Sequence, residues 1–165
     1  MNINTQKTAG RMNRKRTLVL RCIFINYNEP TLKCRRTCPE ETGHVLLIGN
    51  NCGDVAKALS KMSAVKKVLH TEAAYYENYL AENFAPLVVK VSENYSHIVS
   101  SANTFGKNLM PRVSALLNIS QVSDIIKVIS PDTFVRPIYA GNAFATVKST
   151  DEKKCITIRP TSFDA

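Results

Sequence analysis

The feature that most constrains the fold is a short, continuous apolar run, His44–Ile48, which ends in a turn cluster, Gly49–Gly53. A strand with one face in water alternates between apolar and polar residues, whereas a strand buried on both faces of a parallel sheet does not. Val55, Leu59 and Met62 then follow at the spacing of one helical face. A doubly buried strand followed by an amphipathic helix favours an α/β fold.

The alternation of strand and helix continues along the chain. Strands are predicted at 65–69 and 97–99, and apolar residues with helical spacing cover 73–95. Pro86 marks either a break or the first turn of a helix in that segment. The predicted inward face of the segment consists of Leu87, Val91 and Tyr95.

A further helix is predicted from Thr104, as its cap, to about Leu117. Pro111 fits this helix only if it falls within the first turns, because proline in a helix interior removes a backbone hydrogen bond. The predicted apolar face of the helix consists of Leu109, Val113 and Leu116.

The C-terminal quarter of the chain is rich in β-branched residues, which favour strands. Strands are predicted at Asp124–Ile129, Phe134–Tyr139, Ala143–Lys148 and Cys155–Arg159. Gly141-Asn142 is interpreted as a two-residue hairpin turn of type II′, and Asp151-Glu152 as a second turn. The whole pattern predicts an open, doubly wound, mostly parallel sheet with helices on both faces and an antiparallel, β-rich C-terminal end.

Upstream of the first apolar run the pattern is interrupted. An opening strand is predicted at 17–20 or at 22–25, but residues 29–43 contain two prolines and no apolar stripe, so no covering helix is expected there. We therefore predict two parts. Residues 1–43 form a divergent basic head, partly disordered or a degraded first β-α unit, and residues 44–165 form the α/β domain.

Residues 1–36 account for +8 of the net charge of +9, because they hold nine Lys and Arg against Glu29 alone. A basic arm for nucleic acid, a targeting presequence and a disordered or misread extension all fit this composition. The extension is preferred, and no nucleic-acid partner is expected, since no base-reading motif accompanies the charge. No apolar run approaches the roughly 20 residues that cross a bilayer, so no membrane insertion is expected.

The cysteines and histidines do not predict a metal site. Cys34 and Cys38 are closely spaced and His44 follows, but zinc needs four converging ligands and no second pair is present. Reduced thiols are predicted instead. The three histidines, His44, His70 and His97, fall at predicted strand ends and are interpreted as solvated or capped.

Two loops are candidate nucleotide sites. Gly49–Gly53 lacks both standard phosphate-loop spacings and is interpreted as an ordinary strand-to-helix turn. The better candidate lies at a strand end and the following helix start, where open α/β sheets bind ligands. Its residues also allow simple helix capping and close packing. They are Ser100, Ser101, Asn103, Thr104, Gly106 and Lys107.

Asp124, Asp132 and Arg136 are predicted to form a buried or interface ion pair. General acid–base catalysis requires perturbed carboxylates in a cleft beside a nucleophile or metal, and the sequence contains no such constellation. No catalytic residue is assigned. The residues by themselves therefore indicate a binding or scaffold domain and not an enzyme.

An ordered series of motifs resembles the N-terminal domain of electron-transfer flavoprotein alpha subunits, over residues 44–165. The first 43 residues depart from that family. The motifs that carry the resemblance are Gly49–Gly53, Tyr79–Asn83, Ala85–Leu87, Asn103–Arg112, Ser123–Ile126, Ser130–Arg136, Ile138–Ala143 and Thr161–Ala165.

The resemblance implies a heterodimer with a beta subunit that carries electrons from acyl-CoA and other dehydrogenases to a quinone oxidoreductase. It places FAD in a C-terminal domain that is absent here, so this chain is expected to be a fragment that binds no FAD alone. The expected location is a bacterial cytoplasm or, because residues 1–28 lack acids, a mitochondrial matrix. A stand-alone adenine-nucleotide-binding module remains the alternative.

Overall fold

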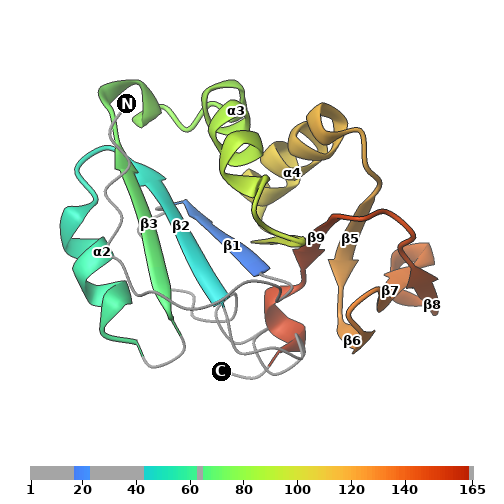
Figure 1. Cartoon of the computed structure of the whole chain (residues 1–165). Helices are drawn as coiled ribbons and strands as arrows, with labels where there is room; N and C mark the ends of the chain where they lie inside the picture. The colour runs from blue at the N-terminus through green and yellow to red at the C-terminus, as the bar shows by residue number, and fades with distance from the viewer. Residues whose placement is uncertain (1–16, 23–42, 63–64, 164–165) are drawn as a thin grey trace.

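The computed structural model describes residues 17–22, 43–62 and 65–163, and these form two sheets (Figure 1). The larger sheet has six strands in the order β3-β2-β1-β4-β9-β5, and every neighbouring pair in it is parallel. Its strands are β1 (Thr17–Cys22), β2 (Gly43–Gly49), β3 (Lys67–Glu72), β4 (His97–Ser101), β5 (Gln121–Ile125) and β9 (Lys154–Ile158).

The small sheet is antiparallel and has the order β6-β7-β8. Its strands are β6 (Lys127–Ser130), β7 (Thr133–Ile138) and β8 (Ala143–Lys148). The predicted α/β architecture with an antiparallel C-terminal end is therefore confirmed. The last strand, β9, does not extend the small sheet but lies between β4 and β5 in the large one.

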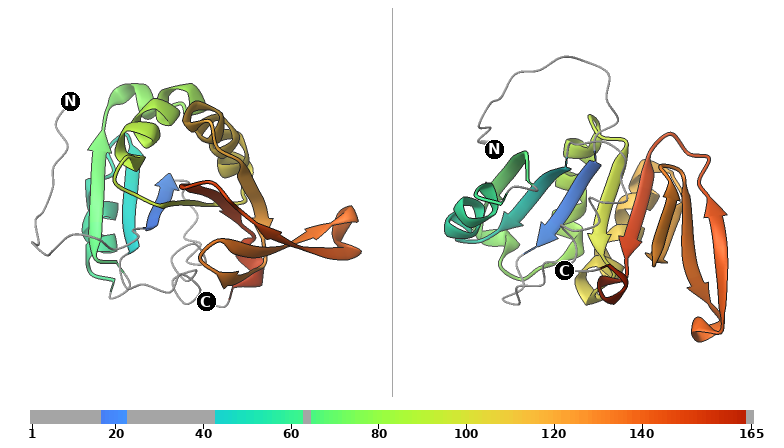
Figure 2. Two further views of the ribbon diagram at one scale, coloured as in Figure 1. Left: turned by 45° about the vertical axis from the view of Figure 1, so that its right-hand side comes forward. Right: turned by 90° about the horizontal axis from the view of Figure 1, so that it is seen from below.

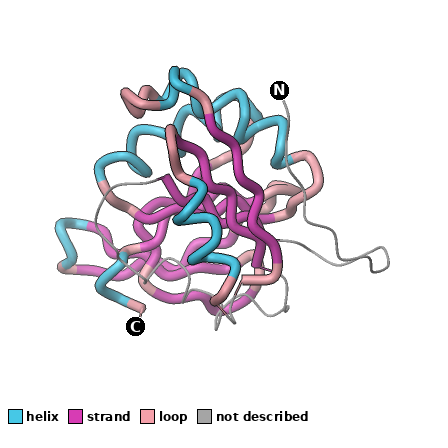
Figure 3. The backbone as a smooth tube through the Cα atoms, turned by 90° about the vertical axis from the view of Figure 1, so that its left-hand side faces the viewer, coloured by secondary structure: helices cyan, strands magenta, loops and turns pink. Residues whose placement is uncertain are grey.

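Strand β2 is buried on both faces, as its unbroken apolar run predicted. Leu46 and Ile48 pack into the core beneath helices α3 (Ala81–Ser92) and α4 (Thr104–Leu117). Val45 and Leu47 pack on the opposite face beside Leu59 of α2 (Gly53–Ser60). Helices thus cover both faces of the sheet, an arrangement that can be followed in Figures 2 and 3.

The predicted helical segment 73–95 is divided, which corrects the sequence interpretation. A 3-10 turn, η2 (Ala74–Tyr76), precedes α3, and between them Tyr79 has a left-handed backbone with φ of 51°. That conformation ends a right-handed helix. Pro86 lies inside α3 and marks neither a break nor a first turn. Of the predicted inward face, Leu87 is buried on α3, whereas Tyr95 is buried beyond its end.

The bounds predicted for α4 are confirmed, but three details differ. The cap is Asn103, whose side chain accepts a hydrogen bond from the Gly106 N–H at 2.8 Å. Pro111 lies in the helix interior and not in its first turns. Leu116 is exposed, and Leu117, four positions after the buried Val113, packs against the core instead.

The predicted strand 124–129 is two strands. Asp124 has φ of 58°, and the pairing of β5 with β9 shifts between Val122 and Ile125. This bulge ends β5 and lets the chain enter the small sheet. The β7–β8 turn also differs from the prediction, since Ile138 pairs with Ala143 and leaves four residues in the loop, of which three have positive φ.

The opening strand lies at the first of its two predicted places, as β1, and it pairs with β2 and β4 inside the sheet. Within the predicted head of residues 1–43, the structure describes β1 and Gly43, which opens β2, whereas the predictions for residues 1–16 and 23–42, including Cys34 and Cys38, fall outside the described residues. Among the described helices, none is long and apolar enough to cross a membrane.

Candidate functional site

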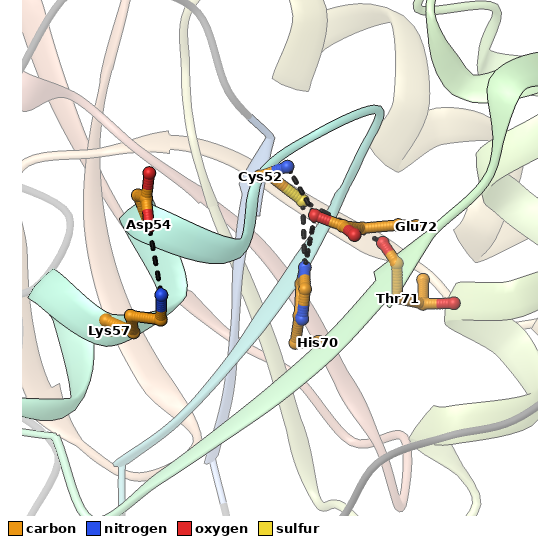
Figure 4. A network of polar contacts seen from close by, with 6 residues as sticks. All are labelled: Cys52, Asp54, Lys57, His70, Thr71 and Glu72. Atoms are coloured by element: carbon orange, nitrogen blue, oxygen red, sulfur yellow. Dashed lines mark hydrogen bonds and ion pairs between the residues drawn. The ribbon is translucent and has the colours of Figure 1, made fainter.

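The strand ends of the large sheet bring together three side chains that sequence reasoning kept apart. His70 and Glu72 alternate with Thr71 along β3, so they point to the same face of the sheet. Cys52 lies in the turn between β2 and α2, and β2 pairs in parallel with β3 so that Gly49 is opposite Glu72. The register therefore places Cys52 over the end of β3 (Figure 4).

These three side chains are in direct contact. The Cys52 Sγ lies 3.1 Å from His70 Nε2, and that nitrogen lies 3.1 Å from Glu72 Oε1. Glu72 also accepts a hydrogen bond from the Cys52 backbone N–H. The sequence interpretation of His70 as solvated or capped missed this cluster, because only the strand register brings residue 52 to residues 70 and 72.

The electrostatics of the cluster decide whether the Cys52 thiol is protonated. Burial of the thiol, together with the nearby Glu72 carboxylate, raises the pKa of Cys52 to about 12. The nucleophilic form of cysteine is the thiolate. Cys52 is therefore a protonated thiol at neutral pH and not an activated nucleophile. Burial likewise raises the pKa of Cys155 to about 12, and both residues are free cysteines, as predicted.

The predicted nucleotide crevice lies at the end of β4 and the start of α4. Ser100 is buried, whereas Thr104 and Lys107 are exposed. A Cβ at Gly106 would collide with the Ser101 carbonyl oxygen and would lie 2.9 Å from the Ser100 hydroxyl. With Asn103 as the cap, these contacts support close packing of α4 on β4. Nucleotide binding there stays a prediction.

The predicted grouping of Asp124, Asp132 and Arg136 is wrong. Asp124 pairs with Arg159, whose Nε lies 3.2 Å from Asp124 Oδ2, and Asp132 pairs with Lys148 at 3.6 Å. The buried Nε of Arg136 has no hydrogen-bond partner. The Asp124–Arg159 pair depends on the bulge in β5 and on the place of β9, and the Asp132–Lys148 pair depends on the register of β7 with β8; the residue types reveal neither.

The other two histidines have specific partners. His44 Nδ1 lies 2.7 Å from the Tyr95 hydroxyl. His97 is buried, and its Nε2 donates to the Pro131 carbonyl at 2.7 Å, which ties β4 to the small sheet. Of the two alternatives predicted for His97, solvated or capped, the solvated one is therefore wrong, because Pro131, far along the sequence, lies against β4.

Among the described residues, the small sheet and its hairpin loop hold the most exposed of the large apolar side chains. Tyr139 and Phe144, in the β7–β8 hairpin, are 79% and 67% exposed, and Ile129 on β6 is 57% exposed. Figure 2 shows this hairpin projecting from the body of the molecule. Large apolar groups in water favour burial against a partner.

Comparison with known proteins identifies the family. The electron transfer flavoprotein domain model matches residues 33–165. The chain is 53% identical over 122 residues to the electron transfer flavoprotein subunit alpha of Pseudomonas aeruginosa, which covers 74% of this chain. It is 50% identical over 127 residues, or 73% of this chain, to the mitochondrial alpha subunit of Dictyostelium discoideum.

This chain belongs to the electron transfer flavoprotein family. The resemblance to its alpha subunits is thereby confirmed, and the match begins at residue 33, before the first apolar run. The chain spans about two fifths of the length of these relatives, 40% of the Pseudomonas protein and 36% of the Dictyostelium protein. The similar alpha subunits include bacterial and mitochondrial proteins.

Within this electron transfer flavoprotein domain there are two groups of candidate site residues: the crevice between β4 and α4, which the sequence predicted, and the cluster of Cys52, His70 and Glu72, which the structure revealed. Of the predicted crevice residues, Asn103 caps α4 and Gly106 packs against Ser100 and Ser101. The Cys52–His70–Glu72 cluster has no counterpart among the predicted sites. A signal was available, since His70 and Glu72 share one strand face and follow a turn that contains Cys52.

Proposed function

We propose that the α/β domain of this chain, with β1 in its sheet, serves as a scaffold and docking domain of an electron transfer flavoprotein alpha subunit. The domain binds a beta subunit, and it is an electron-carrier component and not an enzyme. The chain alone binds no FAD, which the flavin-binding half of the alpha subunit and the beta subunit hold together. In the complete assembly, electrons pass from acyl-CoA and other dehydrogenases to a quinone oxidoreductase.

The small sheet is the observation that carries this proposal. Phe134 is buried against Ile125, Ile156 and Ile158 and anchors the sheet to the body. The other side of the hairpin presents Tyr139 and Phe144 to solvent. Tyrosine and phenylalanine are enriched at protein–protein interfaces, where they supply large contact areas. A family built from alpha and beta subunits makes the beta subunit the partner for this surface.

The location follows from the same relatives. A bacterial cytoplasm is the proposed compartment, and the mitochondrial matrix is the alternative, since alpha subunits from both sources are similar to the chain. Nothing in this proposal requires the basic head to bind a partner.

Co-expression tests the docking function. The chain is produced with an electron transfer flavoprotein beta subunit from a bacterium such as Pseudomonas aeruginosa, and complex formation is followed by size-exclusion chromatography and light scattering. The double variant Tyr139→Ser/Phe144→Ser is expected to weaken binding by at least about tenfold, because interface aromatics of this kind contribute more than 1 kcal/mol each. Leu116→Ser on α4 is the matched control, since it also removes an exposed apolar side chain.

Two results would contradict the proposal. One is the absence of any complex with the wild-type chain. The other is equal loss of binding in Leu116→Ser and the hairpin double variant, which would mean that surface hydrophobicity alone drives association. A visible flavin spectrum in the chain purified alone would refute the claim that it binds no FAD.

A further inference from the structure

A second feature of the molecule points to chemistry that a docking domain does not need. The cluster of Cys52, His70 and Glu72 brings one sulfur, one ring nitrogen and one carboxylate oxygen within 4.8 Å of one another. The three residues come from two elements, the β2–α2 turn and β3, and the parallel register of β2 with β3 aligns them. Figure 4 shows the three side chains pointing toward a common place.

The contacts of the cluster centre on one ring nitrogen. His70 Nε2 lies 3.1 Å from both the Cys52 sulfur and Glu72 Oε1. Without a metal, His70 Nε2–H donates to Glu72 and the Cys52 thiol donates to the Thr71 carbonyl oxygen at 4.0 Å, which is a long contact even for sulfur. A cation at the centre would satisfy all three atoms together, since each would then offer a lone pair.

The distances suit a tetrahedral metal ion. Zinc binds sulfur at about 2.3 Å and imidazole nitrogen at about 2.0–2.1 Å, which separates the two ligand atoms by about 3.5 Å at a tetrahedral angle. Carboxylate oxygen binds at about 2.0–2.2 Å and gives a slightly shorter separation from the nitrogen. The Cys52–His70 and His70–Glu72 contacts of 3.1 Å therefore need to widen by only a few tenths of an ångström.

Burial and charge also suit a metal. The Cys52 side chain is fully buried, whereas the side chains of His70 and Glu72 are 23% and 40% exposed, so the cluster opens to solvent on the Glu72 side. A thiolate and a carboxylate together carry two negative charges, which balance a divalent cation. Mixed sulfur and nitrogen ligands in tetrahedral geometry select zinc over magnesium or calcium.

We propose that Cys52, His70 and Glu72 form a zinc-binding site with a fourth position open to water. Binding replaces the thiol proton of Cys52, which is released to solvent, and forms bonds from the metal to Sγ, Nε2 and a Glu72 oxygen. No electron transfer is involved. The site holds the β2–α2 turn against edge strand β3, and it is independent of the docking surface on the small sheet.

Neighbouring charged groups do not complete the site. Asp54, in the first turn of α2, pairs with Lys57 at 3.1 Å and is almost fully exposed. Figure 4 shows this pair on the helix, apart from the three converging side chains. The proposed ligand set is therefore three residues, and the Gly49–Gly53 turn contributes Cys52 alone.

Cobalt titration of the full chain tests the proposal, because Co²⁺ occupies zinc sites and reports thiolate ligation through its charge-transfer absorption. The wild-type chain is expected to develop this band together with the visible bands of a tetrahedral ion, and zinc is expected to bleach both. Cys52→Ser should abolish the charge-transfer band. His70→Gln and Glu72→Gln should each weaken binding by at least about tenfold, since even outer-shell partners of metal ligands cost that much.

Matched controls separate this site from other thiols. Cys155→Ser removes a second buried cysteine, on the α4 side of the sheet, and should leave the titration unchanged. Cys34→Ser/Cys38→Ser removes the closely spaced pair in the head and should also leave it unchanged. Glu72→Gln keeps an oxygen that can accept the Cys52 N–H, so a folded protein is expected, and circular dichroism verifies the fold of each variant.

Three outcomes would overturn the proposal. They are no cobalt spectrum with the wild-type chain, a charge-transfer band that survives in folded Cys52→Ser, and a band that depends on Cys34 and Cys38 alone. If Cys52→Ser does not fold, unchanged affinity in both His70→Gln and Glu72→Gln would overturn it equally.

Discussion

The two sheets of this protein use similar strands for different purposes. Strand β2 of the parallel sheet has helices on both faces, and Val45 through Ile48 are almost inaccessible to water. Strand β8 of the small sheet alternates between half-buried and exposed residues. The parallel sheet is a core element, whereas the small sheet attaches by one face and leaves apolar groups free. Surface available for a partner therefore lies on the small sheet.

The largest expected effect tests how the small sheet is attached. Phe134→Ala removes a fully buried ring between the two sheets and is expected to lower the free energy of unfolding by about 3–5 kcal/mol. Chemical denaturation measures this. Phe144→Ala, in the same small sheet but exposed, should change stability by less than about 0.5 kcal/mol. Equal effects would mean that the small sheet does not divide into a buried and an exposed side.

The next largest expected effect tests the packing of helix α4 on strand β4. Gly106→Ala places a Cβ against the Ser101 carbonyl and should destabilise by about 1–3 kcal/mol. Gly53→Ala is the matched control, because its Cβ would meet only Glu72 Oε1 at 3.8 Å. Thermal unfolding of both variants measures the difference. If Gly106→Ala leaves the stability unchanged, close packing does not explain this glycine.

A smaller effect concerns the bulge where the chain passes from one sheet to the other. Asp124→Ala loses the Arg159 partner and places alanine at φ of 58°, so a loss of about 1–2 kcal/mol is expected. Asp124→Asn should lower the stability by less, because asparagine tolerates this backbone conformation. Urea unfolding of the two variants provides the measurement, and the reverse order would contradict the argument from backbone strain.

A smaller effect still is expected for the pH dependence of the stability that Asp132, in the small sheet, contributes to the fold. Hydrogen bonds from the hydroxyls of Ser130 and Thr133, with Lys148 nearby, lower the pKa of Asp132 to about 2. A lowered pKa stabilises the fold above the ordinary carboxyl value, and this contribution disappears as pH falls toward 2. The stability difference between wild type and Asp132→Asn should therefore shrink from pH 5 to pH 2. A constant difference would show that the hydrogen bonds do not favour the ionised form.

The smallest expected effect is at the crevice between β4 and α4. If Asn103 and Gly106 serve capping and packing, calorimetric titration with AMP or ATP should give no heat. Binding that Lys107→Ala weakens would establish the alternative function of an adenine-nucleotide module.

Much of the fold was predictable because the relevant signals are local. The unbroken apolar run of β2 and the bounds of α4 follow from residue patterns within a few turns of chain. The hairpin turn at Tyr139–Asn142 was not predictable, since Tyr139 and Ala140 adopt positive φ, which their side chains do not favour. The division of 73–95 was missed for the same reason at Tyr79.

The sequence by itself determined the family, the α/β class and the strands that are buried on both faces, since motif order and hydrophobic period are properties of the chain alone. Tertiary structure alone decided that β9 lies between β4 and β5, that Asp124 pairs with Arg159, and that Cys52 meets His70 and Glu72. The physical reason is that strand order and register join residues far apart in sequence. The free energy that selects one register comes from burial of the whole sheet and not from any segment of it.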